Sequence, residues 1–585
     1  MLPLKPSADA RHATRRRRFK LILVKPSHYD DDGYVIQWLL SAMPSNSLAA
    51  LYGLAREAGE RRVLGENIDV NVTTIDETNT RIKPKTLIRQ IGASGGLGLV
   101  GLVGVQSNQY PRALDIARPL RAAGIPVVIG GFHVSGTIAM LPGITPDLQE
   151  ALDLGVSLFA GEAEGRLDEL LQDAALGRLK PIYNYIRELP GIEAVPLPFM
   201  PRPKVDRTIG RWTTFDAGRG CPFQCSFCTI INVQGRKSRR RSADDVEEII
   251  RNNYRHGITR FFITDDNFAR NKDWELILDR IVALRENAGI DVKLMIQVDT
   301  LCHKIPNFVK KAARAGVKRV FIGMESINPD ALAATKKRQN RIGEYRKLLL
   351  AWKSVGVITY AGYILGFPTD TPASIKRDIE IIKRELSIDI LEFYCLTPLP
   401  GSEDHQTLAK NNVWMDPDLN KYDSEHVVTG HLSMSKESWE NAYAEAWKVY
   451  YTPEHVETIL RRAAATGIGL GRLTDLLLLC SQCTEIERVH PMQGGILRRK
   501  VRTDRRPGLR LEPIWSFYPR YMLESYRKLL AIGKQAYFLH SVQKRIKRDP
   551  LAGAYTDVAL TPDDEAEVEA LELSARANDA KVLVH

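Results

Sequence analysis

Three cysteines stand close together in the run Cys221-Pro-Phe-Gln-Cys225-Ser-Phe-Cys228. Thiolate is the ligand that iron–sulfur clusters prefer, and three neighbouring thiolates can hold three irons of a 4Fe–4S cluster. The fourth iron then keeps an open position, where it can bind a substrate and pass it an electron. A structural zinc site is the alternative, but it requires four ligands, usually in two separated pairs, and the nearest further Cys or His is His256. The spacing therefore favours the cluster.

The composition is that of a globular protein, with 44% hydrophobic and 26% charged residues. A chain of 585 residues is too long for one core, so we expect two or three domains. No apolar run approaches the ~20 residues of a membrane helix. The seven cysteines, three of them clustered, suit a reducing compartment better than a disulfide framework. We expect a cytoplasmic, oxygen-sensitive protein.

The net charge of +12 lies largely in local basic runs. These runs cover residues 15–18, 236–241 and 498–506. No basic strand interleaved with aromatic residues and no recognition helix accompanies them, and charge runs are typical of solvated surface. We do not expect a nucleic-acid partner.

Strand and helix patterns alternate over residues 19–188, after a basic tail at 1–18 that we expect to be disordered. The predicted strands are residues 19–24, 68–75, 99–105, 127–131 and 157–160. The predicted helices are residues 47–58, with Ser47 as N-cap, 112–123 and 165–175. This alternation predicts a doubly wound, Rossmann-like parallel sheet, which binds ligands at the carboxyl ends of its strands.

A proline-rich stretch at residues 189–212 predicts a stiff linker. Strand–helix alternation then resumes over residues 213–400. The predicted strands are residues 213–217, 260–264, 292–297, 319–323, 358–365 and 389–394. Ser242, with Asp245 three residues on, predicts a capped helix from residue 243. The cysteine run directly follows the first of these strands.

Helical patterns dominate residues 401–545, which we expect to cover the open side of the preceding strand–helix domain. The tail at 546–585 is acidic, and we expect it to be peripheral. Cys480 and Cys483 form a CxxC, but no second pair accompanies them. We interpret them as core thiols.

The cysteine spacing, with the aromatic Phe227 before the last thiol, resembles the radical S-adenosylmethionine (radical SAM) superfamily. The resemblance implies that residues 213–400 form a partial (β/α)6 barrel and that Cys221, Cys225 and Cys228 hold a 4Fe–4S cluster. It also implies that the free iron binds the amino and carboxylate groups of S-adenosylmethionine. Reductive cleavage then gives methionine and a 5′-deoxyadenosyl radical, with electrons from a reductant such as flavodoxin or ferredoxin.

Polar or glycine residues follow the later strands in an order that resembles this family. Asp265-Asp266-Asn267 follows the second strand, Gln297-Val298-Asp299 closes the third, and Gly323-Met324-Glu325-Ser326 closes the fourth. Gly362 and Gly366 fit the fifth-strand pattern. The resemblance assigns contacts to S-adenosylmethionine to Asp265, Asp266, Asn267, Gln297, Asp299, Glu325, Ser326 and Gly366.

The N-terminal domain resembles the cobalamin-binding domain that precedes the barrel in one large subgroup of the family. Gly130-Gly131-Phe132-His133 and Gly161-Glu162-Ala163-Glu164 carry this resemblance, because glycines let the backbone approach a large flat ligand. The resemblance assigns cobalamin contacts to Gly130, Gly131, His133, Gly161 and Glu162, although for His133 a structural or hydrogen-bonding role is favoured over metal ligation. The D-x-H-x-x-G sequence of cobalamin proteins with a histidine ligand is absent after the first strand. His28 lies there at a different spacing, so the lower ligand of cobalt stays open.

The resemblance implies a cobalamin-dependent radical SAM methyltransferase that acts on an unactivated carbon of a small-molecule, lipid or peptide substrate, with no catalytic residue beyond the cofactor ligands. Radical cyclisation or rearrangement is the second interpretation. An RNA-modifying methylthiotransferase would carry three further N-terminal cysteines, whereas the first cysteine here is Cys221. A non-enzymatic corrin carrier would leave the three clustered cysteines without a role. The sequence does not identify the substrate.

Overall fold

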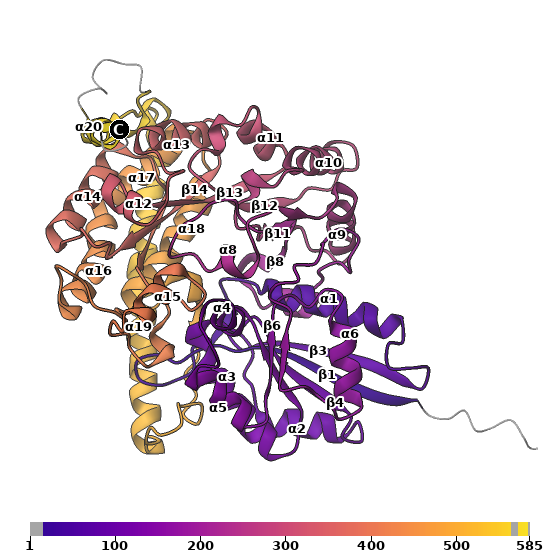
Figure 1. Cartoon of the computed structure of the whole chain (residues 1–585). Helices are drawn as coiled ribbons and strands as arrows, with labels where there is room; N and C mark the ends of the chain where they lie inside the picture. The colour runs from indigo at the N-terminus through magenta and orange to yellow at the C-terminus, as the bar shows by residue number, and fades with distance from the viewer. Residues whose placement is uncertain (1–15, 563–570, 583–585) are drawn as a thin grey trace, which may run out of the picture.

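The computed structural model describes residues 16–562 and 571–582. Two six-stranded parallel sheets, one in each half of the fold, organise the chain. In Figure 1 the N-terminal sheet, coloured indigo to purple, lies below the second sheet, and the C-terminal helices flank both. Among the described residues, no helix combines the length and apolar character needed to cross a bilayer.

The N-terminal sheet has the strand order β3-β1-β4-β5-β6-β7, and all its neighbours are parallel. The strands are β1 (Arg17–Lys25), β3 (Ile68–Asp76), β4 (Gly98–Leu102), β5 (Val127–Gly130), β6 (Ser157–Ala160) and β7 (Ile182–Asn184). The helices are α1 (Asn46–Glu60), α2 (Pro84–Gly92), α3 (Tyr110–Ala122), α4 (Phe132–Met140), α5 (Pro146–Asp153) and α6 (Leu167–Ala175). Successive β1 side chains point to opposite faces, so Leu21 packs with α1 and α6, and Ile22 packs with α2, α3 and α5. A sheet covered on both faces is the doubly wound arrangement that the alternation predicts.

The second sheet curves into a partial barrel with the strand order β15-β14-β13-β12-β11-β8, again all parallel. Its strands are β8 (Trp212–Phe215), β11 (Arg260–Ile263), β12 (Lys293–Val298), β13 (Val317–Glu325), β14 (Ile358–Leu365) and β15 (Ile390–Cys395). The helices are α9 (Ala243–Arg255), α10 (Trp274–Glu286), α11 (Phe308–Arg314), α12 (Pro329–Ala334), α13 (Tyr345–Lys353) and α14 (Pro372–Glu385). The short elements α7 (Arg202–Val205), β9 (Gly218–Arg219), α8 (Ile230–Val233) and β10 (Arg239–Arg240) flank its first strand. Because β8 and β15 do not pair, one side of the barrel lacks a strand.

The C-terminal region is mainly helical and returns to both halves. Its elements are α15 (Glu403–Lys410), α16 (Lys436–Tyr450), α17 (Pro453–Ala465), α18 (Leu470–Ser481), the π-helix η7 (Gln482–Glu487), β16 (Gly495–Arg498), α19 (Ile514–Arg548) and α20 (Glu572–Val582). Strand β16 pairs antiparallel with β2 (Trp38–Ser41) of the N-terminal half. Helix α19 runs along one side of both halves (Figure 1).

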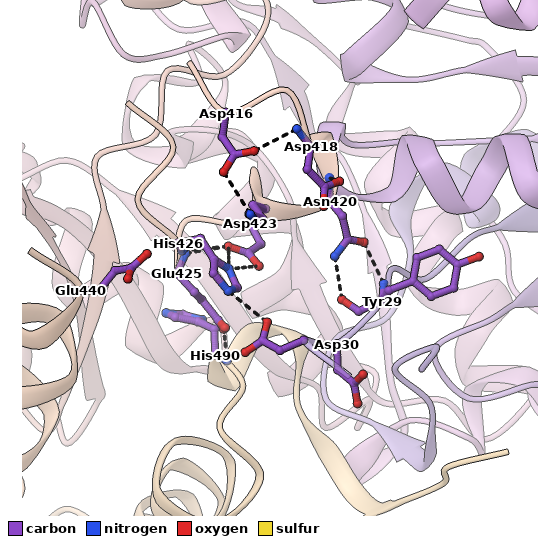
Figure 2. Close-up of polar contacts among 12 residues, drawn as sticks. Tyr29, Asp30, Asp416, Asp418, Asn420, Asp423, Glu425, His426, Glu440 and His490 are labelled. Carbon is purple, nitrogen blue, oxygen red and sulfur yellow. Dashed lines mark hydrogen bonds and ion pairs between the residues drawn. The ribbon is translucent and has the colours of Figure 1, made fainter. Parts of the chain in front are cut away.

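A polar cluster joins the loop after β1 to the segment after α15 (Figure 2). The backbone N–H and C=O of Tyr29 both bond the Asn420 side chain at 2.9 Å. The two ring nitrogens of His426 face Asp423 at 2.9 Å and Asp31 at 3.1 Å. Burial alone would lower the pKa of His426, but the hydrogen bonds to Asp31 and Asp423 raise it to about 11. The charged imidazole therefore ties the two halves together at neutral pH.

The structure corrects several expectations at element ends. Strand β1 begins at Arg17, so the predicted tail at 1–18 runs too far, and residues 1–15 lie outside the described part. Helix α1 is capped by Ser45, not Ser47, because the Ser45 side chain accepts the Leu48 N–H. The helix capped by Ser242 begins at residue 243 as expected. The tail from 546 is not peripheral throughout, since Arg576 of α20 pairs with Asp378 at 2.8 Å.

Candidate active site

The loop that carries the three cysteines begins directly after β9 and is held in place by Asp265. The Asp265 carboxylate, at the end of β11, accepts the backbone N–H groups of Ala217 and Gly218 at 2.7 and 2.8 Å. A third hydrogen bond comes from Asn271 at 3.0 Å. A Cβ at Gly218 would lie 2.8 Å from the same carboxylate, so only glycine fits there. The strand end therefore fixes where the cysteine loop starts.

The chemistry of the loop suits an iron–sulfur cluster. All three thiols are free; Cys225 is buried, and Cys221 and Cys228 are partly exposed. Burial raises the pKa of the Cys221 thiol to about 11 and that of the Cys228 thiol to about 12, so metal ligation has to supply the energy of deprotonation. Gln339 donates a hydrogen bond to the Cys225 sulfur at 3.4 Å. No group of three His, Cys, Asp or Glu side chains in the described part of the chain is placed to hold a single metal ion. A 4Fe–4S cluster does not require one, because each thiolate binds a different iron.

A buried ion pair stands beside the cysteine loop. Lys337 lies 2.6 Å from Glu325 and over the ring of Phe227, at 5.6 Å. Burial alone would lower the pKa of Lys337, but the charges of Glu325 and of the Cys225 thiolate outweigh burial and raise it. Glu325 adopts a φ of +62°, a strained value for a non-glycine residue. A Cβ at Gly323 would lie 2.7 Å from the Glu325 side chain, so the preceding glycine makes room for the pair.

The interior of the barrel holds a cavity of about 370 Å³, which we call the barrel cavity. The side chains that line it alternate along each strand, as the period of a strand requires. From β11 to β15 they are Phe262, Met295, Gln297, Arg319, Phe321, Glu325, Tyr360, Gly362, Ile364, Ile390, Glu392, Tyr394 and Cys395. Phe227 of the cysteine loop lines one end, and Leu476, Leu479 and Cys480 of α18 line another wall. The C-terminal region therefore completes the cavity that the open barrel leaves.

Two of the residues predicted to contact S-adenosylmethionine, Gln297 and Glu325, line the barrel cavity. Asp266 lies near the cysteines, and burial with the charge of Asp265 raises its pKa to about 7.

The other five do not line the cavity, and their contact with S-adenosylmethionine stays a prediction. Asp265 holds the cysteine loop, as described above. Asn267 and Asp299 bond each other, and Asp299 also pairs with Arg270 at 2.6 Å. The Ser326 hydroxyl accepts a backbone N–H at 2.9 Å, and Gly366 lies against Trp439. Asp265, Asn267, Asp299 and Ser326 therefore bond other protein groups, and Gly366 makes room for the Trp439 ring.

A second cavity, of about 200 Å³, lies where the carboxyl ends of the N-terminal strands face the barrel; we call it the interdomain cavity. Gly130, Gly131, Gly161 and Glu162 line it, as the cobalamin resemblance implies. A Cβ at Gly131 would meet the backbone nitrogen of Val105 at 2.1 Å. The wall also includes Leu21, Leu23, Leu54, Leu99, Val128 and Phe159, and Arg219, Val233 and Gln234 from around the cysteine loop. The hollow is apolar, lined by glycine and open toward the cysteine loop, which fits a large flat cofactor.

His133, a predicted cobalamin contact for which a structural role was favoured, is held by hydrogen bonds within the N-terminal domain. Its two ring nitrogens face Ser107 at 3.1 Å and Asp147 at 2.7 Å, and its ring lies 4.2 Å from that of Tyr110. It is buried and does not line the interdomain cavity. Its role is structural. His28 is likewise buried outside this cavity, and burial lowers its pKa to about 4.

A buried charge cluster, which we call the Arg219 cluster, lies between the interdomain cavity and the cysteine loop. Arg219, two residues before Cys221, pairs with Glu162 at 2.5 Å, Glu164 at 2.6 Å and Asp216 at 2.7 Å. Arg239 also pairs with Glu162 at 2.5 Å. All the side chains that Arg219 binds are less than 10% exposed. The predicted cobalamin residue Glu162 thus anchors the cysteine loop to the N-terminal domain.

Three residues of these sites were not found from the sequence. Lys337 stands in a basic run, which is typical of solvated surface, and only the tertiary fold reveals its burial. Arg219 precedes the cysteines without a recognisable pattern. Glu392 did leave a signal, since it is a carboxylate inside the otherwise uncharged strand Ile-Leu-Glu-Phe-Tyr-Cys.

Comparison with known proteins decides the family. Residues 217–382 match the Radical SAM superfamily. This part of the chain, which holds the three cysteines, is a radical SAM domain. It is 28% identical over 429 residues to bacteriochlorophyllide d C-8(2)-methyltransferase of Chlorobaculum tepidum, a match that covers 70% of this chain and 90% of the relative. It is 25% identical to hopanoid C-2 methylase of Rhodopseudomonas palustris over 295 residues, 49% of this chain and 53% of the relative.

Among solved structures, the fold resembles that of the radical S-adenosylmethionine methyltransferase TsrM from Kitasatospora setae, solved with cobalamin and a 4Fe–4S cluster bound. The TM-score is 0.56 at 16% identity, and the match covers 77% of this chain and 95% of TsrM. The prediction of a radical SAM enzyme with an N-terminal doubly wound parallel sheet and a partial barrel is confirmed. The prediction of a 4Fe–4S cluster with S-adenosylmethionine is likewise confirmed for this radical SAM protein.

Proposed function

We propose that this radical SAM protein is a cobalamin-dependent methyltransferase that methylates an unactivated carbon. One observation carries the proposal: both cavities border the cysteine loop, with Phe227 lining the barrel cavity and Arg219, two residues before Cys221, lining the interdomain cavity. A methyl donor held in one cavity and a substrate held in the other would therefore both lie beside the cluster.

When bound, the cluster and S-adenosylmethionine supply the electron and the 5′-deoxyadenosyl radical, and cobalamin supplies the methyl group. The protein positions the cofactors and the substrate relative to one another. Cys221, Cys225 and Cys228 would hold three irons, and Glu325 with Lys337 presents opposite charges next to them. Apolar side chains line most of both cavities and exclude water from a reactive radical.

We propose a largely apolar organic substrate. The relatives are named for bacteriochlorophyllide d and for hopanoids, which are large and mostly apolar molecules. The barrel cavity here offers the matching surface, with Phe262, Met295, Phe321 and Leu476 among its walls. Flavodoxin or ferredoxin is the proposed electron donor.

The test is anaerobic reconstitution with iron, sulfide and cobalamin, followed by an assay of 5′-deoxyadenosine with dithionite as reductant. We expect 5′-deoxyadenosine from the wild type and at least ~100-fold less from Cys225→Ala, because removal of one ligand abolishes the cluster. Bound corrin is followed by its visible spectrum. Absence of 5′-deoxyadenosine in the wild type would reject the radical mechanism. Formation of 5′-deoxyadenosine by protein that binds no corrin would instead favour radical cyclisation or rearrangement.

A further inference from the structure

Glu392 is a buried carboxylate that the chemistry described so far does not use. It lies in the middle of β15, is 5% exposed and lines the barrel cavity. Its carboxylate accepts one hydrogen bond, from the Tyr394 hydroxyl at 2.7 Å. Within residues 16–562 and 571–582, no Lys, Arg or His lies within ion-pair distance of it. The charge is therefore neither paired nor exposed to bulk water.

Such a group is costly to the fold. A carboxylate in an apolar cavity loses its hydration, and burial raises the pKa of Glu392 to about 7. The other cavity-facing residues of this strand, Ile390 and Tyr394, show that apolar and aromatic side chains fit the same wall. A leucine at 392 would pack without this cost. Buried polar groups that the fold does not satisfy are typical of binding sites.

Space is left beside Glu392 for a ligand. Gly362 of β14 pairs with Glu392 in register. A Cβ at Gly362 would approach the Phe321 ring to 3.1 Å and the Tyr394 ring to 3.4 Å, so the two rings pack closely over this glycine. The hollow next to the carboxylate is the barrel cavity itself, which Gly362 and Glu392 both line.

The groups that face Glu392 come from every element around it. Tyr394 lies on its own strand, Tyr360 on β14 and Cys480 on α18; burial raises the pKa of Tyr360 to about 12, and burial also raises that of Cys480. Arg319 of β13 reaches toward Trp212, with its guanidinium 5.0 Å from that ring. None of these groups neutralises Glu392, so a bound molecule has to satisfy it.

We propose that Glu392, oriented by Tyr394, binds an N–H or O–H donor of the substrate, which is therefore an apolar molecule with one donor group on the end that enters the barrel. The inference rests on the proposed function, because it takes the barrel cavity as the substrate site. It narrows the substrate class: an unfunctionalised hydrocarbon end would leave the carboxylate unsatisfied, whereas an alcohol or an amine would satisfy it.

The experiment uses three probes of equal size: 1-octanol, 1-octylamine and heptyl methyl ether, which has an acceptor but no donor. The readout is the rise in Tm of the anaerobically reconstituted protein at equal probe concentration. We expect the alcohol and the amine to raise Tm at least twice as much as the ether in the wild type. In Glu392→Leu we expect this advantage to vanish. An ether as stabilising as the alcohol, or an advantage that persists in Glu392→Leu, overturns the proposal.

Two controls separate binding from folding and from turnover. Without probe, Glu392→Leu is expected to melt at or above the wild-type Tm, whereas a lower Tm indicates a structural carboxylate and overturns the proposal. Glu392→Gln adds an N–H donor that can bond the ether oxygen and does not ionise, so it should reduce the preference for octanol and lose any gain in octylamine binding between pH 6 and 8. Probe binding needs no turnover. The 5′-deoxyadenosine assay therefore tests the proposed function separately.

Discussion

The Arg219 cluster and the barrel cavity treat buried charge in opposite ways. In the Arg219 cluster, three carboxylates surround one guanidinium, and Arg239 adds a second cation. In the barrel cavity, Glu392 faces a single hydroxyl, and the Nε of Arg319 is buried without a hydrogen-bond partner among the described residues. Both regions lie within the same fold and beside the same cysteine loop.

The paired charges of the Arg219 cluster stabilise the fold, whereas the unpaired charge of Glu392 is available to bind a ligand. A paired cluster between two domains fixes their relative position, which two cofactors acting on one substrate require. An unpaired carboxylate weakens the fold and gains a partner only when a ligand binds. Removing a charge from the Arg219 cluster should therefore lower the free energy of unfolding, whereas removing the charge of Glu392 should raise it.

The largest effect is expected for Arg219→Met, which leaves Glu164 buried without a cation and leaves Glu162 and Asp216 with Arg239 and Arg241 alone. We expect the free energy of unfolding to fall by about 3–5 kcal/mol, as measured by urea denaturation. The matched control is Arg314→Met, which breaks an exposed pair with Glu286 and should leave the free energy of unfolding nearly unchanged. Iron bound per chain should also fall in Arg219→Met and not in the control. If the two variants were equally stable, the Arg219 cluster would not stabilise the fold more than an exposed ion pair does.

The second effect is a pH dependence that belongs to Glu392. Burial raises its pKa to about 7 from an ordinary value of 4.5, so the folded state binds the proton more tightly than the unfolded state. The stability from this group is complete below about pH 4.5 and is lost as pH rises through about 7. Between pH 4.5 and 8 the wild type should lose about 3 kcal/mol more than Glu392→Gln. If the free energy of unfolding changed with pH in the same way for the wild type and Glu392→Gln, Glu392 would already have a partner in the protein.

Much of the fold could be predicted from the sequence because local patterns determine it. For example, the predicted strands at residues 157–160 and 358–365 match β6 (Ser157–Ala160) and β14 (Ile358–Leu365). Strand β2 escaped prediction because its partner β16 is more than 450 residues away in sequence. The start of α19 also escaped prediction. A proline usually stands in the first turn of a helix or interrupts it, but Pro519 lies inside α19.

The candidate site divides in the same way. Cys221, Cys225 and Cys228 could be assigned from spacing alone, because a cluster demands a fixed local arrangement. Asp265 and Asp299 could be placed at strand ends but not given a role, because only the fold shows that backbone N–H groups and Arg270 occupy their oxygens. Partners far apart in sequence, such as Arg219 with Glu162, leave no local pattern.

The smallest effect on stability is expected for Gly362→Ala, which adds one methyl group to the hollow beside Glu392. The change should alter the free energy of unfolding by no more than about 1 kcal/mol, because the new contacts are tight without overlapping backbone. It should nevertheless halve the rise in Tm that octanol causes. Gly553→Ala, where no atom lies within 4 Å, is the control and should leave the octanol effect unchanged. Full octanol binding by Gly362→Ala would place the ligand elsewhere in the barrel cavity.

The return of the C-terminal segment has a consequence for biosynthesis. Leu476 and Cys480 wall the barrel cavity, and β16 completes a ribbon with β2, yet both segments leave the ribosome long after the cysteine loop. A nascent chain can thus form both parallel sheets while the interior of the barrel is still open to the surroundings. The wall of the barrel cavity that α18 forms is therefore added only after both parallel sheets have been synthesised.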